Sequence, residues 1–480
     1  MPRVLMLSLI ASASMAEVRL PALFSDRAVM QAGAPLRVWG RASPGERVTV
    51  RMAGKEASGV ADALGEWSAF LPPLPAGGPH ELGVAASNTV TVRDVLIGEV
   101  WVASGQSNMA FNMKRESHAA AGIPVARFPR IRFFRVAQKT SPVPLDDVLG
   151  SWEETTPEAA ANFSAVAYYF ARDLHKRQGV PFGVIQSAVG GTPAESWTSG
   201  AALTGDPALL PLLSNWQKRL AEYPEAQARF EKEKKAGQQP PPGPGHRWEP
   251  AGLYNGMIAP LTRYAIRGAI WYQGENNAGR GHGGLYRRLF ETMIRDWRSA
   301  WAQGDFPFLW VQLPKFIQRA PGASWPELQQ AQRDSLALRN TGMAVILDAG
   351  NLEDVHPTDK LIPGTRLARV ARGVAYGENI VYSGPLLRQI TREGSDLRLW
   401  FDHAGSGLRF QGAPIGFAVA GANGSYKAAA ARVDGATVVV SAEGIAGPVQ
   451  VRYGWGGNGE GNLANSEDLP ASPFQAASRD

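Results

Sequence analysis

The sequence predicts an α/β protein in which a central parallel sheet is flanked by a small β domain at each end of the chain. Nearly continuous apolar strands alternate with helical stretches in the middle of the 480 residues, and short strands with Gly/Pro turns lie before and after them. A composition of 44% hydrophobic and 19% charged residues is that of a folded protein. The length corresponds to about two to four domains, each able to bury its own core.

Residues 1–16 are predicted to be a secretory signal peptide. Arg3 supplies the positive charge, residues 4–15 are apolar but too short to span a bilayer comfortably, and cleavage is expected after Ala16. The alternative is an apolar N-terminal strand of the first domain. We therefore expect an exported protein, periplasmic or secreted, whose mature chain contains no membrane-spanning segment.

Residues 17–95 and 382–480 are predicted to form the two flanking β domains. In the first, the period-2 runs within 35–52, 65–74 and 80–86 are broken by Ser, Pro and Gly, which is typical of short antiparallel strands. In the second, strands are expected at 397–404, 416–421, 436–442 and 449–455.

Residues 96–381 are predicted to form the α/β domain. Its strands lack polar alternation, so both faces of the sheet should be buried under the helices that lie between them. Strands are expected at 95–104, 180–191, 267–276, 306–313 and 343–350, and helices at 161–178, 285–301 and 325–339. Residues 204–250 interrupt this alternation with a polar helical stretch and a Pro/Gly run, which predicts an exposed insertion, either a lid or a surface excursion.

The composition excludes several classes of function. The chain has no cysteine, so disulfides, thiolate metal sites and a cysteine nucleophile are excluded. The net charge of +6 is spread along the chain, and no basic cluster is interleaved with aromatic residues, so nucleic acid is not an expected partner. The histidines lack a paired spacing such as H-x-x-x-H, so neither a metal nor another cofactor is expected.

Polar turns are expected at the carboxyl ends of the strands, where reactive residues gather in open α/β sheets. The first turn, G-Q-S-N at 105–108, offers Ser107 as a nucleophile. A serine hydroxyl needs a base to take its proton, and its own backbone N–H can donate to the oxyanion that forms on attack. The alternative is that Ser107 caps the N-terminus of a helix, a common position for serine after a strand.

Two further turns offer donors for the oxyanion. Gly190 and Gly191 would let a backbone N–H approach a reacting oxygen closely, and the side-chain amide of Gln273 would be another donor. The alternatives are a tight strand-to-helix turn for the glycines and a polar turn that satisfies its own backbone for Gln273.

His356 in the fourth turn is the candidate base. Among the seven histidines it has acids at −3 and −2, Glu353 and Asp354, and a carboxylate at this distance can fix the tautomer and orientation of an imidazole. The alternative is a capping or loop histidine. The G-x-S-x-G elbow of α/β-hydrolases is absent around Ser107, which argues against that fold.

The order of these turns, Ser, Gly, an amide, then acid and His, resembles the SGNH hydrolase superfamily. More narrowly, G-E-V-W-V-A-S-G-Q-S-N-M, S-A-V-G-G-T-P-A-E-S-W-T-S, W-Y-Q-G-E-N-N-A and D-V-H-P-T-D-K resemble the sialate O-acetylesterase family, within a resemblance that covers most of residues 30–475. It implies an SGNH-type three-layer catalytic domain between β-sandwich-like domains, and a serine esterase that removes O-acetyl groups from sugars. It also implies Ser107 as nucleophile, His356 as base and Gln273 in place of the superfamily's Asn.

The acid that orients His356 is left open. The spacing of the superfamily favours Glu353, whereas the family's common Asp-Ile-His-Pro places the acid at Asp354. Side chains at these two positions point in different directions, so only one can orient the imidazole well. A Ser–His pair helped by a backbone carbonyl is the third option.

The expected substrate is an acetylated carbohydrate, with sialic acid, xylan, xyloglucan and pectin all possible. Two alternatives are a general carboxylesterase or lipase of the same superfamily and a non-catalytic carbohydrate-binding protein. Strand-end aromatics are also typical of a core, but the aromatic and polar residues of the turns are candidate sugar contacts: Gln106, Trp197, Trp271, Tyr272, Glu275 and Asn276.

Overall fold

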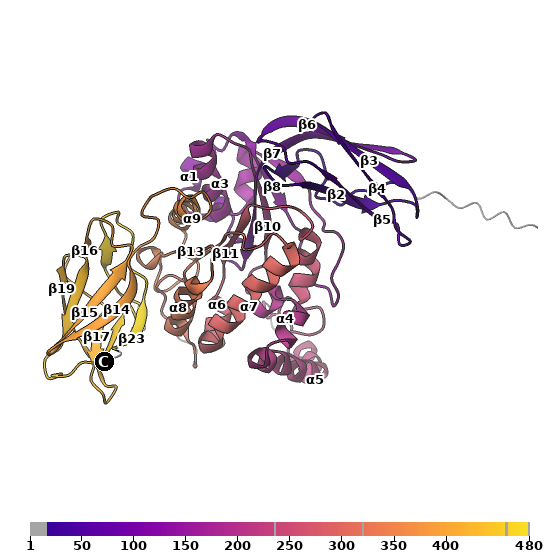
Figure 1. Cartoon of the computed structure of the whole chain (residues 1–480). Helices are drawn as coiled ribbons and strands as arrows, with labels where there is room; N and C mark the ends of the chain where they lie inside the picture. The colour runs from indigo at the N-terminus through magenta and orange to yellow at the C-terminus, as the bar shows by residue number, and fades with distance from the viewer. Residues whose placement is uncertain (1–16, 235–236, 319–320, 457–458, 479–480) are drawn as a thin grey trace, which may run out of the picture.

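The computed structural model describes residues 17–234, 237–318, 321–456 and 459–478, so the predicted signal peptide lies outside the described residues. Within the described part of the chain, no helix is long and apolar enough to cross a bilayer. A central α/β body lies between two β-rich ends of the chain (Figure 1). This mixed α/β architecture confirms the predicted class of fold.

The central sheet has the strand order β13-β12-β11-β7-β10-β8-β9, and every neighbouring pair is parallel except the one that β9 makes at the edge. All five predicted strands are present, but the last one ends at Ala344, earlier than expected. The strands of this sheet are β7 (Thr89–Gly105), β8 (Phe128–Arg135), β9 (Trp152–Thr155), β10 (Phe182–Ala188), β11 (Gly268–Tyr272), β12 (Phe308–Val311) and β13 (Thr341–Ala344).

Helices cover both faces of this sheet, as the alternation of strands and helices predicts. Trp101 on β7 packs edge-on against Phe170 of α3, whereas Phe308 and Trp310 on β12 pack against Phe290 of α7. On β11, Gly268 pairs with Trp101 and the next residue, Ala269, pairs with Phe308. Consecutive residues of a strand face opposite sides, so the side chains of Trp101 and Phe308 point to opposite faces of the sheet. The helices are α1 (Ala119–Gly122), α2 (Pro157–Asn162), α3 (Ala165–Gln178), α4 (Gly200–Thr204), α5 (Leu210–Glu233), α6 (Glu275–Gly279), α7 (Gly283–Trp301), α8 (Trp325–Asp334) and α9 (Leu361–Val374).

Several helical turns are shorter. Five-residue π-helical geometry occurs at Tyr254–Ile258. The 3-10 turns are Met113–Arg115, Ala194–Trp197, Pro207–Leu209, Ala259–Leu261, Ser335–Ala337 and Leu347–Ala349.

The N-terminal β region shares its last strand with the central sheet. The first half of β7 pairs with β6 and β1, and its second half pairs with β10 and β11. The predicted boundary at residue 95 therefore falls inside one continuous strand. The remaining strands are β1 (Val29–Gln31), β2 (Leu36–Arg41), β3 (Arg47–Met52), β4 (Lys55–Val60), β5 (Glu66–Leu71) and β6 (Gly77–Ala85).

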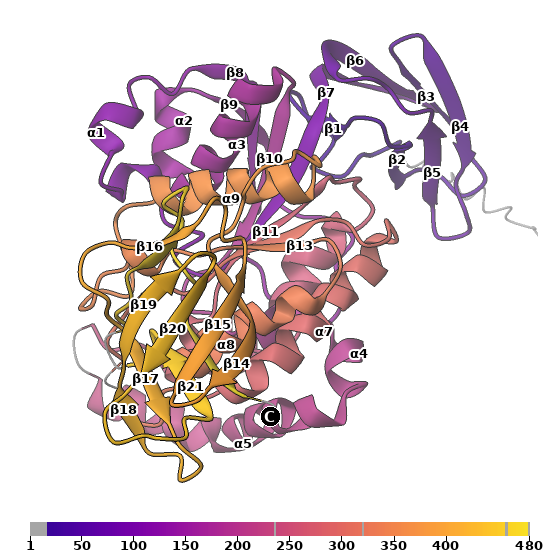
Figure 2. The same cartoon turned by 60° about the vertical axis from the view of Figure 1, so that its left-hand side comes forward.

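The C-terminal region is built from antiparallel strands, mainly in two four-stranded sheets, and lies beside α8 and α9 (Figure 2). The buried side chains Leu397, Val438 and Val451 belong to its core. Its strands are β14 (Leu386–Glu393), β15 (Asp396–Asp402), β16 (Leu408–Phe410), β17 (Phe417–Ala420), β18 (Tyr426–Ala428), β19 (Ala430–Asp434), β20 (Thr437–Ser441), β21 (Gln450–Tyr453), β22 (Leu463–Asn465) and β23 (Phe474–Ala477).

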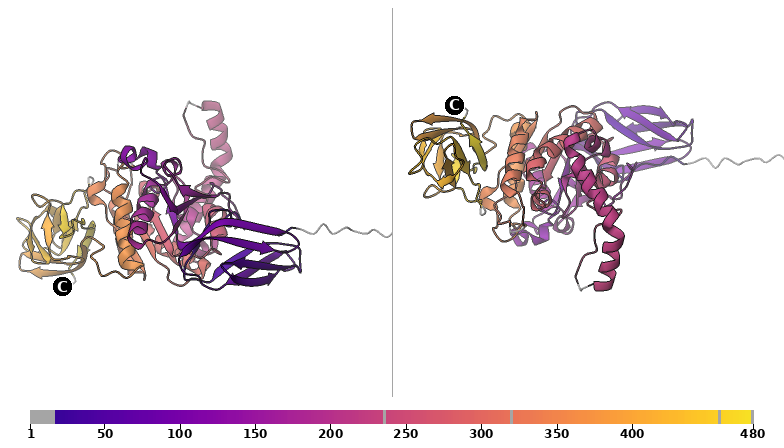
Figure 3. Two further views of the ribbon diagram at one scale, coloured as in Figure 1. Left: turned by 90° about the horizontal axis from the view of Figure 1, so that it is seen from above. Right: turned by 90° about the horizontal axis from the view of Figure 1, so that it is seen from below.

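The predicted insertion is a surface excursion built on α5. Figure 3 shows this helix standing out from the body of the molecule. Only Leu212 and Phe230 are buried along it. After the helix the chain returns to the body, where Trp248 donates a hydrogen bond from Nε1 to the carbonyl of Gly191 at 2.6 Å. The insertion therefore reaches one of the turns that the sequence singles out.

Candidate active site

Three of the predicted turns lie side by side because their strands are parallel neighbours. Gly105, the last residue of β7, pairs with Ala188 on β10 and with Tyr272 on β11. The turns that follow therefore leave the same edge of the sheet, the edge where open α/β sheets carry their sites.

Gly105 is required for the turn that presents Ser107. Its φ is +132°, and a Cβ at this position would lie 2.2 Å from the carbonyl oxygen of Tyr272. The next residue, Gln106, donates its backbone N–H to that same oxygen at 3.0 Å. The chain can thus cross the end of β11 closely and place Ser107 at the sheet edge.

The structure brings Ser107 and His356 into contact. Ser107 Oγ lies 2.8 Å from His356 Nε2, although 249 residues separate them in the sequence. Ser107 lies in a turn and caps none of the described helices. Burial lowers the pKa of His356, with Lys360 and Arg115 acting in the same direction and Asp354 opposing them. A largely neutral imidazole facing a serine hydroxyl can accept its proton.

The geometry favours Asp354 over Glu353 as the acid. Asp354 Oδ1 lies 3.5 Å from His356 Nδ1 and also accepts the backbone N–H of His356 at 2.8 Å. The loop is shaped by Asn351, whose Oδ1 accepts the backbone N–H groups of Glu353 and Asp354. This turn directs the carboxylate at −2 to the imidazole, a direction that spacing alone does not reveal.

Gly190 lies directly against the candidate nucleophile. A Cβ on Gly190 would be 3.5 Å from Ser107 Cβ, whereas the carbonyl of Gly191 is held by Trp248 Nε1 and, at 2.9 Å, by Asn276 Nδ2. Within the described ranges, no acceptor takes the backbone N–H of Ser107, Gly190 or Gly191. Free backbone N–H groups therefore lie beside Ser107.

The structure contradicts the predicted role of Gln273. This side chain is fully buried, and its amide nitrogen donates to the carbonyl of Thr192 at 3.1 Å and to Asn277 Oδ1 at 2.7 Å. Its Oε1 accepts the hydroxyl of Tyr286 at 2.8 Å. Both amide hydrogens are used, so Gln273 braces the turn and has none left for an oxyanion.

For the aromatic candidates for sugar contact, Trp197, Trp271 and Tyr272, the structure supports the alternative, a place in the core. All three side chains are fully buried. Trp271 packs against Trp197 and against Trp297 of α7, whereas Tyr272 points to the other face of the sheet, where Lys360 lies over its ring. Gln106 and Glu275 are also buried, at 3% and 7% exposure. Of the six candidate contacts, only Asn276 keeps a partly exposed side chain.

A hydrogen-bonded series of buried polar side chains lies beneath the site, and the sequence pattern does not reveal it. Lys360 Nζ donates to Asn108 Oδ1 at 2.5 Å, and Asn108 Nδ2 donates to Glu275 Oε1 at 2.5 Å and to the carbonyl of Val355 at 2.9 Å. Burial raises the pKa of Glu275 and lowers the pKa of Lys360 to about 7. The quoted motifs contain these residues, but polar residues after a strand look like ordinary turn residues.

A second missed feature is a group of arginines around Trp248. The guanidinium groups of Arg219 and Arg280 lie 5.6 and 5.5 Å from its ring centroid. Arg247 Nη2 would lie 3.9 Å from a Cβ on Gly191, and among the described residues the buried Nε of Arg247 finds no hydrogen-bond partner. Arg280 pairs with Glu195 at 3.2 Å, but within the described residues no carboxylate lies within ion-pair distance of Arg219 or Arg247.

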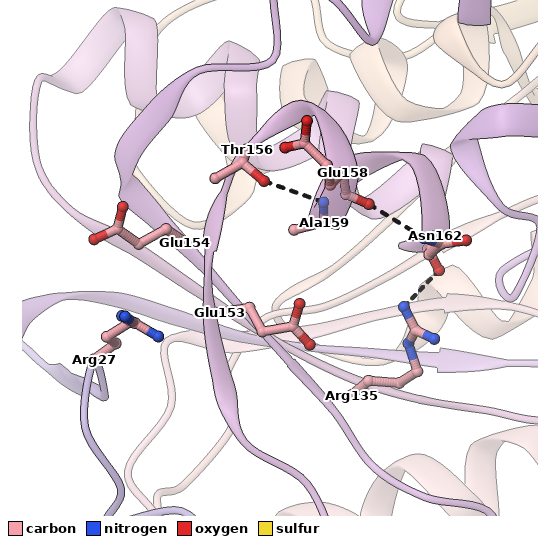
Figure 4. A pocket seen from close by; sticks show the side chains of 8 residues that line it. All are labelled: Arg27, Arg135, Glu153, Glu154, Thr156, Glu158, Ala159 and Asn162. Atoms are coloured by element: carbon pink, nitrogen blue, oxygen red, sulfur yellow. Dashed lines mark hydrogen bonds between the residues drawn. The ribbon is translucent and has the colours of Figure 1, made fainter.

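Other parts of the described chain offer weaker candidates for a functional site. A hollow of about 560 Å³ lies at the β8–β9 edge, where Glu153, Glu154 and Glu158 share it with Arg27 and Arg135 (Figure 4). It shares no residue with the Ser107 site. No group of three or more metal-ligating side chains is found among the residues that the structure describes.

The chain is similar to known carbohydrate esterases. Residues 244–369 match the family described as "Carbohydrate esterase, sialic acid-specific acetylesterase". The sialate O-acetylesterase of Rattus norvegicus is 31% identical over 399 residues, which is 74% of this chain and 72% of that protein. The Mus musculus enzyme is 30% identical over 418 residues, 76% and 75% of the two chains. The crystal structure of a carbohydrate acetylesterase from Xanthomonas citri has a TM-score of 0.84 and 38% identity, covering 96% of this chain and 99% of that one.

Proposed function

Because this chain belongs to the sialate O-acetylesterase family, we propose that it removes O-acetyl groups from carbohydrates through an acetyl-enzyme formed on Ser107. That the protein is an esterase follows from its relatives, and the contact of 2.8 Å between Ser107 Oγ and His356 Nε2 supports this mechanism. We further propose that residues 96–381 form an SGNH-type three-layer catalytic domain between β-sandwich-like domains. Export of the protein stays a prediction from residues 1–16.

In the proposed reaction, His356 takes the proton of Ser107 as the hydroxyl oxygen attacks the acetyl carbonyl. The tetrahedral intermediate collapses, the C–O bond to the sugar breaks, and His356 returns the proton to the leaving sugar hydroxyl. Water then attacks the acetyl-enzyme by the same route, releasing acetate and restoring Ser107. Asp354 orients the imidazole and stabilises its protonated form.

The oxyanion is proposed to bind the backbone N–H groups of Ser107 and Gly190. Both lie at the nucleophile and neither is used by another described acceptor. Asn276, rather than Gln273, is the proposed side-chain donor to the oxyanion. Its amide donates one hydrogen to the carbonyl of Gly191, and the second hydrogen is left for the oxyanion. Each donor of this kind typically contributes roughly 10²–10³ in rate.

The proposed function is tested by measuring acetate release from a panel of acetylated sugars and polysaccharides. We expect release from acetylated sugars, together with faster hydrolysis of aryl acetate than of aryl octanoate, because the site edge carries polar turns rather than an apolar groove. Octanoate hydrolysis at an equal or higher rate would favour the general carboxylesterase or lipase. Binding of the sugars without acetate release would favour the non-catalytic carbohydrate-binding protein.

The arginines around Trp248 favour a sugar that carries a carboxylate, such as a sialic or uronic acid. Arg247 lies beside Gly191, and its Nε has no hydrogen-bond partner in the part of the chain that the structure describes. Burial together with Arg280 lowers the pKa of the neighbouring Arg219. A guanidinium group left without a carboxylate partner matches a bidentate anion. We therefore propose that Arg247 binds the substrate carboxylate close to the acetyl ester.

Replacing Arg247 by Gln should lower kcat/KM about 10- to 100-fold for acetylated acidic sugars, because a charge-assisted pair is lost. Hydrolysis of neutral aryl acetate should change by less than about twofold. The matched control is Arg229→Gln, which replaces an exposed arginine on α5. An equal loss on acidic and neutral substrates would contradict the carboxylate site.

A further inference from the structure

Asn108 joins the three segments that make up the site. It follows Ser107 directly, its Nδ2 donates to the carbonyl of Val355, which precedes His356, and the same nitrogen reaches Glu275 at the start of α6. The amide therefore ties the nucleophile turn both to the His356 loop and to α6. Its orientation fixes where the imidazole stands relative to the hydroxyl.

Lys360 determines that orientation. Its side chain is fully buried at the N-terminus of α9, and its Nζ donates to Asn108 Oδ1, so the Asn108 nitrogen must face Glu275 and Val355. The ammonium also lies 4.7 Å from the ring centroid of Phe111 and 5.5 Å from that of Tyr272. Buried lysines are rarely retained without a partner, and here a neutral amide separates the cation from the carboxylate of Glu275.

The buried cation also acts on the imidazole. A positive charge near His356 opposes the second positive charge that would arise if the ring were protonated from solution. Lys360 and Arg115 both act on His356 in this way, whereas the carboxylate of Asp354 acts in the opposite sense. Lys360 in turn is faced by three carboxylates and one guanidinium group: Glu275, Asp354, Asp359 and Arg115.

We propose that Lys360 is a positioning residue, which holds the His356 loop on Ser107 through Asn108 and whose ammonium keeps His356 neutral and ready to accept the proton of the serine. The inference rests on the proposed ester hydrolysis by Ser107 and His356. It assigns to Lys360 no contact with the substrate. Burial lowers the pKa of Lys360 to about 7, so the side chain is charged in the acidic range in which His356 would otherwise be protonated.

The test is the pH dependence of kcat/KM for aryl acetate in Lys360→Met, which keeps most of the length of the unbranched side chain and removes its charge. We expect the acidic limb to move to higher pH by about one unit, because loss of the cation raises the pKa of His356. The plateau should fall about tenfold as Asn108 loses its partner, through kcat more than through KM. Lys114→Met removes an exposed lysine that is bonded to Asn162 and should leave the profile unchanged.

A folded Lys360→Met protein with an unmoved acidic limb and a plateau within about twofold of the wild type would overturn the proposal. Because Glu275 would be left as a buried, uncompensated carboxylate, the single variant can fail to fold. Lys360→Met/Glu275→Gln removes both charges, and its limb should still move upward, whereas an unmoved limb would again overturn the inference. Ser107→Ala separates failure of the proposed function from failure of the role of Lys360. Hydrolysis that persists in Ser107→Ala contradicts the proposed function, whereas a wild-type pH profile in Lys360→Met contradicts only the role of Lys360.

Discussion

Replacing Ser107 by Ala should lower kcat/KM for aryl acetate by roughly 10³- to 10⁶-fold, and replacing His356 by Ala should cost a similar factor. Ser107 Oγ and His356 Nε2 lie 2.8 Å apart, and a hydroxyl without a base or a base without a hydroxyl cannot form the acetyl-enzyme. The double variant should be no slower than either single variant, because the two groups act as one unit.

A nearby pair of the same residue types provides the control. His118 Nε2 lies 3.3 Å from Asp359, and Ser117 Oγ bonds to the hydroxyl of Thr358. Ser117 and His118 are exposed, and within the described ranges no serine bonds to the His118 ring. Ser117→Ala and His118→Ala should retain activity within about twofold. Near-wild-type turnover by Ser107→Ala or by His356→Ala would refute the assignment of the nucleophile or the base.

The parts of the fold that the sequence predicts well are those in which local pattern and burial coincide. The apolar runs of β7, β10, β11 and β12 need helices on both faces, and Gly179 ends α3 with a φ of +70°, as a C-terminal glycine should. β8 was missed because its sequence F-P-R-I-R-F-F-R mixes arginines with aromatics at the sheet edge. The N-terminal boundary could not be placed, because one strand serves both sheets.

The order of the turns predicts which residues meet, but not which way their side chains face. Ser107 and His356 meet as expected, whereas Gln273 and Tyr272, from the same turn, point into the interior. Consecutive residues of a strand face opposite sides of the sheet, and because helices cover both sides here, Trp271 and Tyr272 are both buried. The bond between Lys360 and Asn108 spans 252 residues, and no local pattern signals such a contact.

Replacing Asp354 by Asn should lower kcat/KM for aryl acetate by roughly 10²- to 10⁴-fold. The carboxylate lies 3.5 Å from Nδ1 of His356, where it orients the ring and stabilises the imidazolium that forms during attack. Asn preserves the shape of the loop and can still accept the backbone N–H of His356, so the loss would reflect the charge. Glu353→Gln is the matched control, and we expect its rate to stay within about twofold of the wild type.

The pH profile makes this prediction specific. Asp354 raises the pKa of His356, so its removal should move the acidic limb to lower pH while the plateau falls. Lys360→Met should move the same limb to higher pH, because a cation and an anion act on one imidazole with opposite sign. If the substitutions only damaged the loop, the plateau would fall in Asp354→Asn and in Lys360→Met, but their acidic limbs would not move in opposite directions. A large loss in Glu353→Gln, with Asp354→Asn near the wild type, would instead assign the acid to position −3, as the superfamily spacing suggests.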